Sequence, residues 1–238
     1  SVRSKSDEDI HNISYNPFYF NDLAYTKVFE HLLNVEEDYV ERALAIALNT
    51  IRDIISLTGE ASKDQEKIFS VYDRFLLLDI DFFTLKSGEI DHLSARDNVK
   101  ALAAVIKELS EKTIGAYDTD PSKAKGLYEK YFKDLPDSRS MWRLKLFVLS
   151  IYPEYFKGEL KEHFWKLFDL DNYSEILSGA EYERALQKSF VVFSEEEKRD
   201  YVKKVISYFK KKDEDKKNDK ENWHLRHGSE ILSVILDQ

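Results

Sequence analysis

Two kinds of helical pattern follow one another in residues 138–168, SRSMWRLKLFVLSIYPEYFKGELKEHFWKLF. The first part, MWRLKLFVLSIY, is apolar on almost every side, and Arg139, Arg143 and Ser150 form only a narrow polar strip. A helix of this kind is expected to be buried between neighbours, and Pro153 is expected to end it. The second part has lysines and glutamates on one side and an apolar face made of Phe156, Leu160, Phe164, Leu167 and Phe168. The stretch therefore predicts a helix hairpin with a covered inner helix and an outer helix that meets water.

The rest of the chain also favours helices. Its 238 residues include only 7 Gly and 4 Pro, and no Asn-Gly or Asp-Gly pair, whereas a fold of many β-hairpins depends on such turns. Apolar residues recur at helical spacing in residues 40–55 and 99–109, and stops are expected at Gly59 and near Gly115. The predicted fold class is all-α, with roughly ten helices in antiparallel pairs.

Several predicted helix starts carry the capping-box pattern. In this pattern a side-chain oxygen at the cap accepts a hydrogen bond from a backbone N–H, and an acidic or amide side chain three residues later returns one. The pairs with this spacing are Asn34/Glu37, Ser62/Gln65, Ser178/Glu181 and Ser194/Glu197. Asp120 before Pro121 predicts a further start, because proline at the first helical position loses no hydrogen bond.

Paired helices in series fit either an irregular HEAT-like α-solenoid or a multi-helix bundle. No repeat of fixed period can be aligned along the sequence, but the order of a nearly all-apolar helix and a one-sided helix favours the solenoid. The best internal boundary is the stretch GAYDTDPSKAKG, residues 115–126. We therefore expect helical subdomains at 1–115 and 116–238, or one continuous domain over 1–238.

A family resemblance covers about the last 100 residues. Residues 138–168 resemble one HEAT-like helix pair, and residues 180–209, AEYERALQKSFVVFSEEEKRDYVKKVISYF, resemble helical segments of large bacterial multidomain proteins that include defence NTPases. The resemblance implies a scaffold or sensor region. It carries no catalytic residue over to this chain.

Charge and composition restrict the possible partners. The formal net charge is -9 and the pI is near 5.3, which argues against binding nucleic acid through the field of the whole protein. The absence of Cys excludes disulfides, thiolate metal ligands and a Cys nucleophile. The sequence contains no run of about 18 apolar residues, so no membrane-spanning helix is predicted. Because the chain begins at Ser1 without an initiator Met, we expect a fragment of a larger protein.

One stretch, LLLDIDFFTL in residues 76–85, is similar to the nucleophile motif of haloacid-dehalogenase-type phosphatases, in which Asp79 would attack phosphorus and Asp81 would act as acid and base. Two phenylalanines stand where a tight phosphate-facing turn is needed before Thr84, and no alternation of strands and helices surrounds the motif. A helix end with two exposed carboxylates is the better interpretation. No glycine-rich phosphate loop and no G-x-S-x-G occurs, so we expect no enzymatic activity and no cofactor.

His224 and His227 in NWHLRHG are the weak candidates for a metal site. Their spacing of three places them on one face of a helix, where both could ligate one ion. A third ligand cannot be located in the sequence and HExxH does not occur, so two surface histidines are the favoured interpretation. His31, His92 and His163 are interpreted as structural.

Aromatic side chains supply the candidates for partner contact. The stretch SYNPFYFNDLAY holds five aromatic residues within twelve, without a clean period, and could dock against a partner or cover the first helices. The candidate residues are Tyr15, Phe18, Tyr19 and Phe20, together with Trp223 and Arg226 at the predicted start of the last helix.

The lysine-rich stretch of residues 210–221 raises the question of a nucleic-acid grip. Acidic residues interrupt every basic run in it, which favours a solvated helix end and a loop, and the helix dipole accounts for lysines near a helix C-terminus. We expect a noncatalytic α-helical protein-interaction or scaffold module with a protein partner. The alternatives are a nucleic-acid-linked accessory module of a defence or processing complex and, third, a metal-dependent helical hydrolase.

Overall fold

The computed structural model describes residues 22–59, 95–135, 139–169, 180–215 and 223–236. Within these ranges it has nine α-helices, one short 3-10 helix and no strand. The helices are α2 (Asp22–Leu33), α3 (Glu37–Gly59), α4 (Ala95–Gly115), α5 (Pro121–Tyr131), α6 (Arg139–Leu149), α7 (Lys157–Lys166), η3 (Leu167–Asp169), α9 (Ala180–Phe190), α10 (Glu195–Asp215) and α11 (Trp223–Leu236). The predicted all-α class is confirmed, and the number of helices lies close to the expected one.

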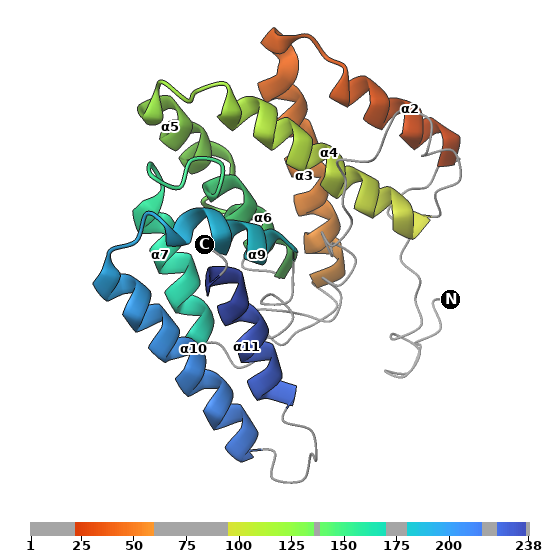
Figure 1. Ribbon diagram of the computed structural model, residues 1–238. Helices are drawn as coiled ribbons and strands as arrows, with labels where there is room; N and C mark the ends of the chain where they lie inside the picture. Colours follow the sequence, from red (N-terminus) through yellow and green to blue (C-terminus); the bar gives the residue numbers. More distant parts are fainter. Residues whose placement is uncertain (1–21, 60–94, 136–138, 170–179, 216–222, 237–238) are drawn as a thin grey trace, which may run out of the picture.

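The helices form two groups, one around α4 and one around α10 and α11, and α6 lies between them (Figure 1). α3 and α2 both pack against α4, and α10 pairs with α11. α6 packs mainly against α9 and also contacts α4 and α7, so it joins the two groups. In Figure 1, α10 forms the lower left edge of the molecule and α2 lies at the upper right. None of the described helices has both the length and the apolar composition that crossing a bilayer requires.

One contiguous cluster of buried side chains runs through the described helices, from Phe29 in α2 to Ile235 in α11. α6 is covered on every side, since each residue from 141 to 150 is buried, including Arg143. The prediction of a helix buried between its neighbours is therefore confirmed. The cluster includes residues on both sides of Gly115, and the division into subdomains 1–115 and 116–238 stays a prediction.

α7 is the one-sided helix that the sequence predicts. On its apolar face and in the following 3-10 helix, the buried side chains are Phe156, Leu160, Phe164 and Leu167, and Phe168 is half-buried. Glu162 and Lys166 are exposed on the other side. α6 ends at Leu149, ahead of Pro153, so the proline stands in the turn between the two helices.

Two of the predicted helix starts are formed with their capping bonds. At α10, Glu197 N donates to Ser194 Oγ (3.3 Å) and Ser194 N donates to Glu197 Oε2 (2.8 Å), which completes the capping box. At α5, Asp120 is the cap and its Oδ1 accepts from Lys123 N at 3.3 Å.

The predicted start at Asn34 is wrong. Asn34 N donates to Glu30 O (3.1 Å), so this residue closes α2, and α3 begins only at Glu37. The predicted stops at Gly59 and Gly115 are confirmed as the ends of α3 and α4. The pair Ser62/Gln65 and the cap Ser178 lie outside the described residues.

Gly228 of α11 lies close against Phe209 of α10. A Cβ placed on this glycine would lie 2.8 Å from Cδ2 and 3.1 Å from Cγ of Phe209, both too short for a normal contact. Gly228 itself is buried, and Phe209 belongs to the core. The hairpin therefore depends on the missing side chain at this position.

Candidate functional site

Most of the residues selected from the sequence as partner contacts lie outside the described residues. Tyr15, Phe18, Tyr19 and Phe20 precede Asp22, and Asp79 and Asp81 fall in the gap 60–94. Trp223 and Arg226 lie on the first turns of α11, where only the backbone is described. Their roles stay predictions.

The two candidate metal ligands lie on one helix. His224 and His227 both belong to α11, so their spacing of three residues places them on the same side of it. Among the side chains that the structure describes, no group of three or more His, Cys, Asp or Glu is arranged to hold a metal ion. The site at His224 and His227 stays a hypothesis. His163, by contrast, is structural as predicted, because its Nδ1 lies 2.8 Å from Glu159 O and its ring packs on Trp142.

A group of cations surrounds the ring of Phe147 in α6. Lys107 Nζ from α4 lies 4.9 Å from the ring centroid, and Arg184 Cζ from α9 lies 4.8 Å from it. Arg184 also pairs with Glu111 Oε1 at 3.1 Å. Burial, and then the neighbouring Arg184, lower the pKa of Lys188. These contacts tie α4, α6 and α9 together, and we assign the group a structural role.

Four other buried polar side chains, in α4, in α6 and just after α6, donate to backbone carbonyls. Lys145 Nζ donates to Leu135 O (2.8 Å) and Ser150 Oγ donates to Phe147 O (2.7 Å). Ser110 and Thr113 of α4 donate to carbonyls one turn earlier in the same helix. These four side chains are therefore satisfied by backbone carbonyls, as burial requires.

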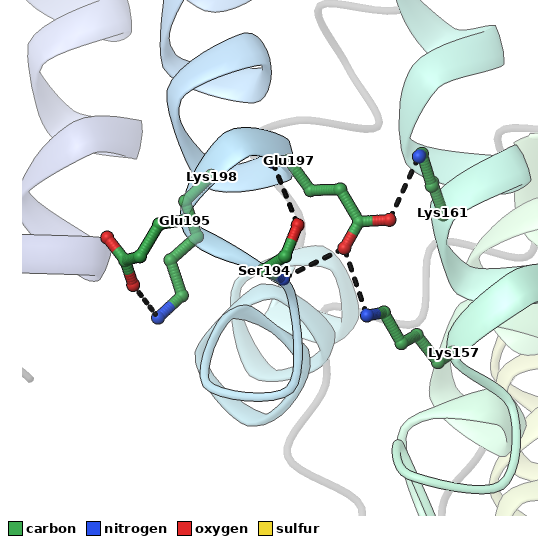
Figure 2. A network of polar contacts seen from close by, with 6 residues as sticks. All are labelled: Lys157, Lys161, Ser194, Glu195, Glu197 and Lys198. Atoms are coloured by element: carbon green, nitrogen blue, oxygen red, sulfur yellow. Dashed lines mark hydrogen bonds and ion pairs between the residues drawn. The ribbon is translucent and has the colours of Figure 1, made fainter.

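Glu197 is the centre of a polar network between α7 and α10 (Figure 2). Its Oε1 accepts from Lys161 Nζ (2.9 Å), and its Oε2 lies 3.0 Å from Lys157 Nζ while also accepting from Ser194 N. The side chain is only 18% exposed. The backbone bond from Ser194 and the two lysines lower the pKa of Glu197 to about 2. The network fixes the start of α10 against α7.

Aromatic rings fill the space between α7, α9 and α10. Tyr182 and Tyr201 are fully buried with their hydroxyl groups hydrogen-bonded to each other. Phe164 packs edge-on against both rings, at centroid distances of 5.4 and 6.1 Å. Burial raises the pKa of Tyr182, so this hydroxyl stays protonated. These rings belong to the core.

Glu41 links α3 to α5. Its Oε1 accepts from Lys130 Nζ (2.7 Å) and from the hydroxyl of Tyr131 (2.6 Å). The bond from Lys130, followed by that from Tyr131, lowers the pKa of the Glu41 carboxyl. Arg52 Nη2 also donates to Tyr131 O at 3.3 Å. The contacts hold two helices together at the surface.

The outer face of α3 exposes apolar side chains. Five exposed residues lie on this face at spacings of three and four: Tyr39, Arg42, Ile46, Asn49 and Asp53. Tyr39 is 53% exposed and Ile46 is 50% exposed. Tyrosine and arginine are the residue types that protein interfaces favour. We call these five residues the α3 face.

The outer face of α10 carries unpaired cations. Arg199, Lys203, Ile206 and Lys210 follow one another at spacings of four, three and four residues, and all four are exposed. Arg199, Lys203 and Lys210 make no ion pair within the described residues. Ile206 is 40% exposed between them. We call these four residues the basic strip.

Sequence reasoning did not select either face. On α3 the available signal was the seven-residue spacing of Tyr39 and Ile46 on the polar side of the helix. On α10 the dipole was expected to account for the lysines, but the dipole acts within about one turn of a helix end. Lys203 lies in the middle of a helix that extends to Asp215, so that explanation is wrong for it.

No protein-family model, no curated protein and no solved structure matches the chain.

Proposed function

We propose that this chain is a noncatalytic α-helical protein-interaction or scaffold module of a larger protein. The observation that carries the proposal is the α3 face. Tyr39 and Ile46 leave half of their surface in water on a helix whose opposite side is buried. A protein partner that covered both side chains would remove apolar surface from water, which favours association.

The α3 face has the chemistry of a protein contact. Arg42 lies between Tyr39 and Ile46, and makes no ion pair within the described residues. Asn49 and Asp53 extend the same face with polar groups that are suited to the rim of an interface. The face thus combines an aromatic anchor, an aliphatic anchor and hydrogen-bonding groups.

The helix pairs are also proposed to stack as an irregular HEAT-like solenoid. The pairing of α3 with α4 and of α10 with α11 supports this architecture. In such a stack the outer helices present long faces to partners.

Site-specific photo-crosslinking in the cells that express the protein tests the proposal. A photoreactive residue at position 46 is compared with one at position 191, because Val191 is 61% exposed in the turn before α10, away from the α3 face. We expect a discrete protein adduct at position 46 that is absent at 191 and is lost in Tyr39→Ala. Identical adducts at the two positions, or none at position 46, would contradict the proposal.

A further inference from the structure

We propose that the basic strip of α10 is a docking site for a short acidic protein segment that carries an apolar residue between its carboxylates. The strip lies on a different helix from the α3 face, and the inference does not depend on that face. In Figure 1, α10 runs along the outer edge of the molecule, away from α2 and α3.

The position of the cations requires an explanation other than the helix dipole. Arg199 and Lys203 lie in the first half of α10, towards the positive end of the dipole. Lys210 lies more than one turn before Asp215, beyond the range over which the negative end stabilises a cation. The dipole therefore favours none of the three positions.

The neighbouring acids make no ion pair with the strip within the described residues, and only Glu195 is recorded near one of its cations: Lys198, and then Arg199, lower the pKa of its carboxyl. Glu197 is bound by Lys157 and Lys161, and Glu195 pairs with Lys198 (Figure 2). These contacts use two of the three glutamates in the first turn of α10. The three cations of the strip are exposed and make no ion pair within the described residues. Carboxylates of an acidic partner would provide the negative charges that these three cations do not find in the described part of the chain.

The size and composition of the strip favour a protein segment over a nucleic acid. The strip extends over three turns of helix, about 16 Å at 1.5 Å per residue. Glu195 and Glu196 precede it and Asp213 and Asp215 follow it in the sequence, so a long phosphate backbone would run into acidic residues. Ile206 stands between Lys203 and Lys210 and offers an apolar contact, which a phosphate track does not use.

The occupant is therefore a segment of about three helical turns, with carboxylates spaced to meet Arg199, Lys203 and Lys210. An apolar side chain at its centre contacts Ile206. The carboxylates supply the association rate and the orientation, and the apolar contact supplies affinity that is retained in salt.

Fluorescence anisotropy with a synthetic probe tests this inference on the full chain. The probe is a labelled helical peptide of about 15 residues, with glutamates around a central leucine. Its control peptide has glutamine in place of every glutamate. The strip variant is Arg199→Glu/Lys203→Glu/Lys210→Glu, and the control variant Lys27→Glu/Lys125→Glu/Lys133→Glu changes the net charge equally at exposed positions elsewhere.

We expect the acidic peptide to bind the wild type with an affinity that falls as salt is raised. Affinity should fall at least about tenfold in the strip variant and less than about twofold in the control variant. Ile206→Ala should weaken binding by a factor that does not change with salt. A neutral strip variant, Arg199→Gln/Lys203→Gln/Lys210→Gln, provides the same test if the charge reversal disturbs folding.

Three outcomes would overturn the inference. The first is an equal loss of affinity in the strip and control variants, and the second is equal binding of the glutamate and glutamine peptides. The third is tighter binding to a short DNA duplex or to anionic lipid vesicles than to the acidic peptide, which would assign the strip to a different class of partner.

Discussion

α6 and α10 both carry positive charge, but the fold uses it in opposite ways. Arg143 and Lys145 of α6 are buried, and Lys145 donates to a backbone carbonyl. Arg199 and Lys203 of α10 are exposed, without an ion pair in the described part of the chain. The same residue types are therefore part of the core in one helix and part of the charged surface in the other. Substitutions should therefore affect stability in α6 and binding in α10.

The largest effect is expected from Phe147→Ala in α6. Phe147 is fully buried and its ring lies between Lys107 and Arg184, so truncation removes core packing and both cation contacts. The free energy of unfolding should fall by about 3–5 kcal/mol in urea denaturation. The matched change in α10, Ile206→Ala, should cost less than about 0.5 kcal/mol. Equal losses in the two variants would remove the distinction between the helices.

The next largest effect is expected from a substitution at the close contact between α10 and α11. Gly228→Ala places a methyl group against the ring of Phe209 and should destabilise the protein by about 1–3 kcal/mol. Gly126→Ala is the control, because no heavy atom lies within 4 Å of a Cβ at this position in α5. That substitution should stabilise the protein by about 0.5–1 kcal/mol through helix propensity. Thermal or urea unfolding of both variants should give opposite signs, and the same sign in both would contradict the close approach.

A smaller and pH-dependent effect is expected at the start of α10. Glu197→Gln weakens the capping box and both lysine contacts, and should cost about 1–2 kcal/mol at neutral pH. The pKa of Glu197 is lowered from 4.5 to about 2 in the folded protein, so its ionised form stabilises the fold above pH 4.5. This contribution is lost as the pH falls towards 2, and the difference from the variant should shrink over that range.

The control for this experiment is Glu196→Gln. Glu196 is exposed beside Glu197 and lies outside the network of Figure 2. Its substitution should leave the free energy of unfolding unchanged at neutral pH. A cost at Glu197 that stays constant from neutral to acidic pH would rule out the ionised carboxylate as its source.

The smallest effect on stability is expected on the basic strip. Lys203→Gln and Lys210→Gln should each change the free energy of unfolding by less than about 0.5 kcal/mol, because both side chains are exposed and neither makes an ion pair within the described residues. Urea unfolding measures this directly. A loss above about 1 kcal/mol would mean that the strip stabilises the fold and is not left open for a partner.

The sequence was informative where a structural cause is local. Ser194 and Glu197 lie three residues apart, and the same spacing produces the capping box in the structure. The even distribution of apolar residues over α6 likewise predicted its complete burial. The same local rule failed at Asn34, because the backbone N–H of this residue bonds to Glu30 O at the end of α2 and the residue does not cap α3.

Contacts between segments far apart in the sequence left no local sequence pattern from which they could be predicted. Phe147 meets Lys107 and Arg184, which lie about 40 residues away on either side of it, and no local pattern predicts that meeting. The two exposed faces were missed for a related reason. Whether Ile46 and Ile206 are covered depends on which helices pack beside them, and helical spacing alone does not determine this.

The contact between Phe209 and Gly228 also has an evolutionary consequence. Any homologue that keeps the α10–α11 hairpin must keep a residue without a side chain opposite the ring, or replace the ring by a smaller group. An aromatic residue followed by glycine nineteen positions later is therefore a pattern by which distant homologues can be recognised. Where the glycine has changed, the aromatic position is expected to have changed with it, so the two should covary.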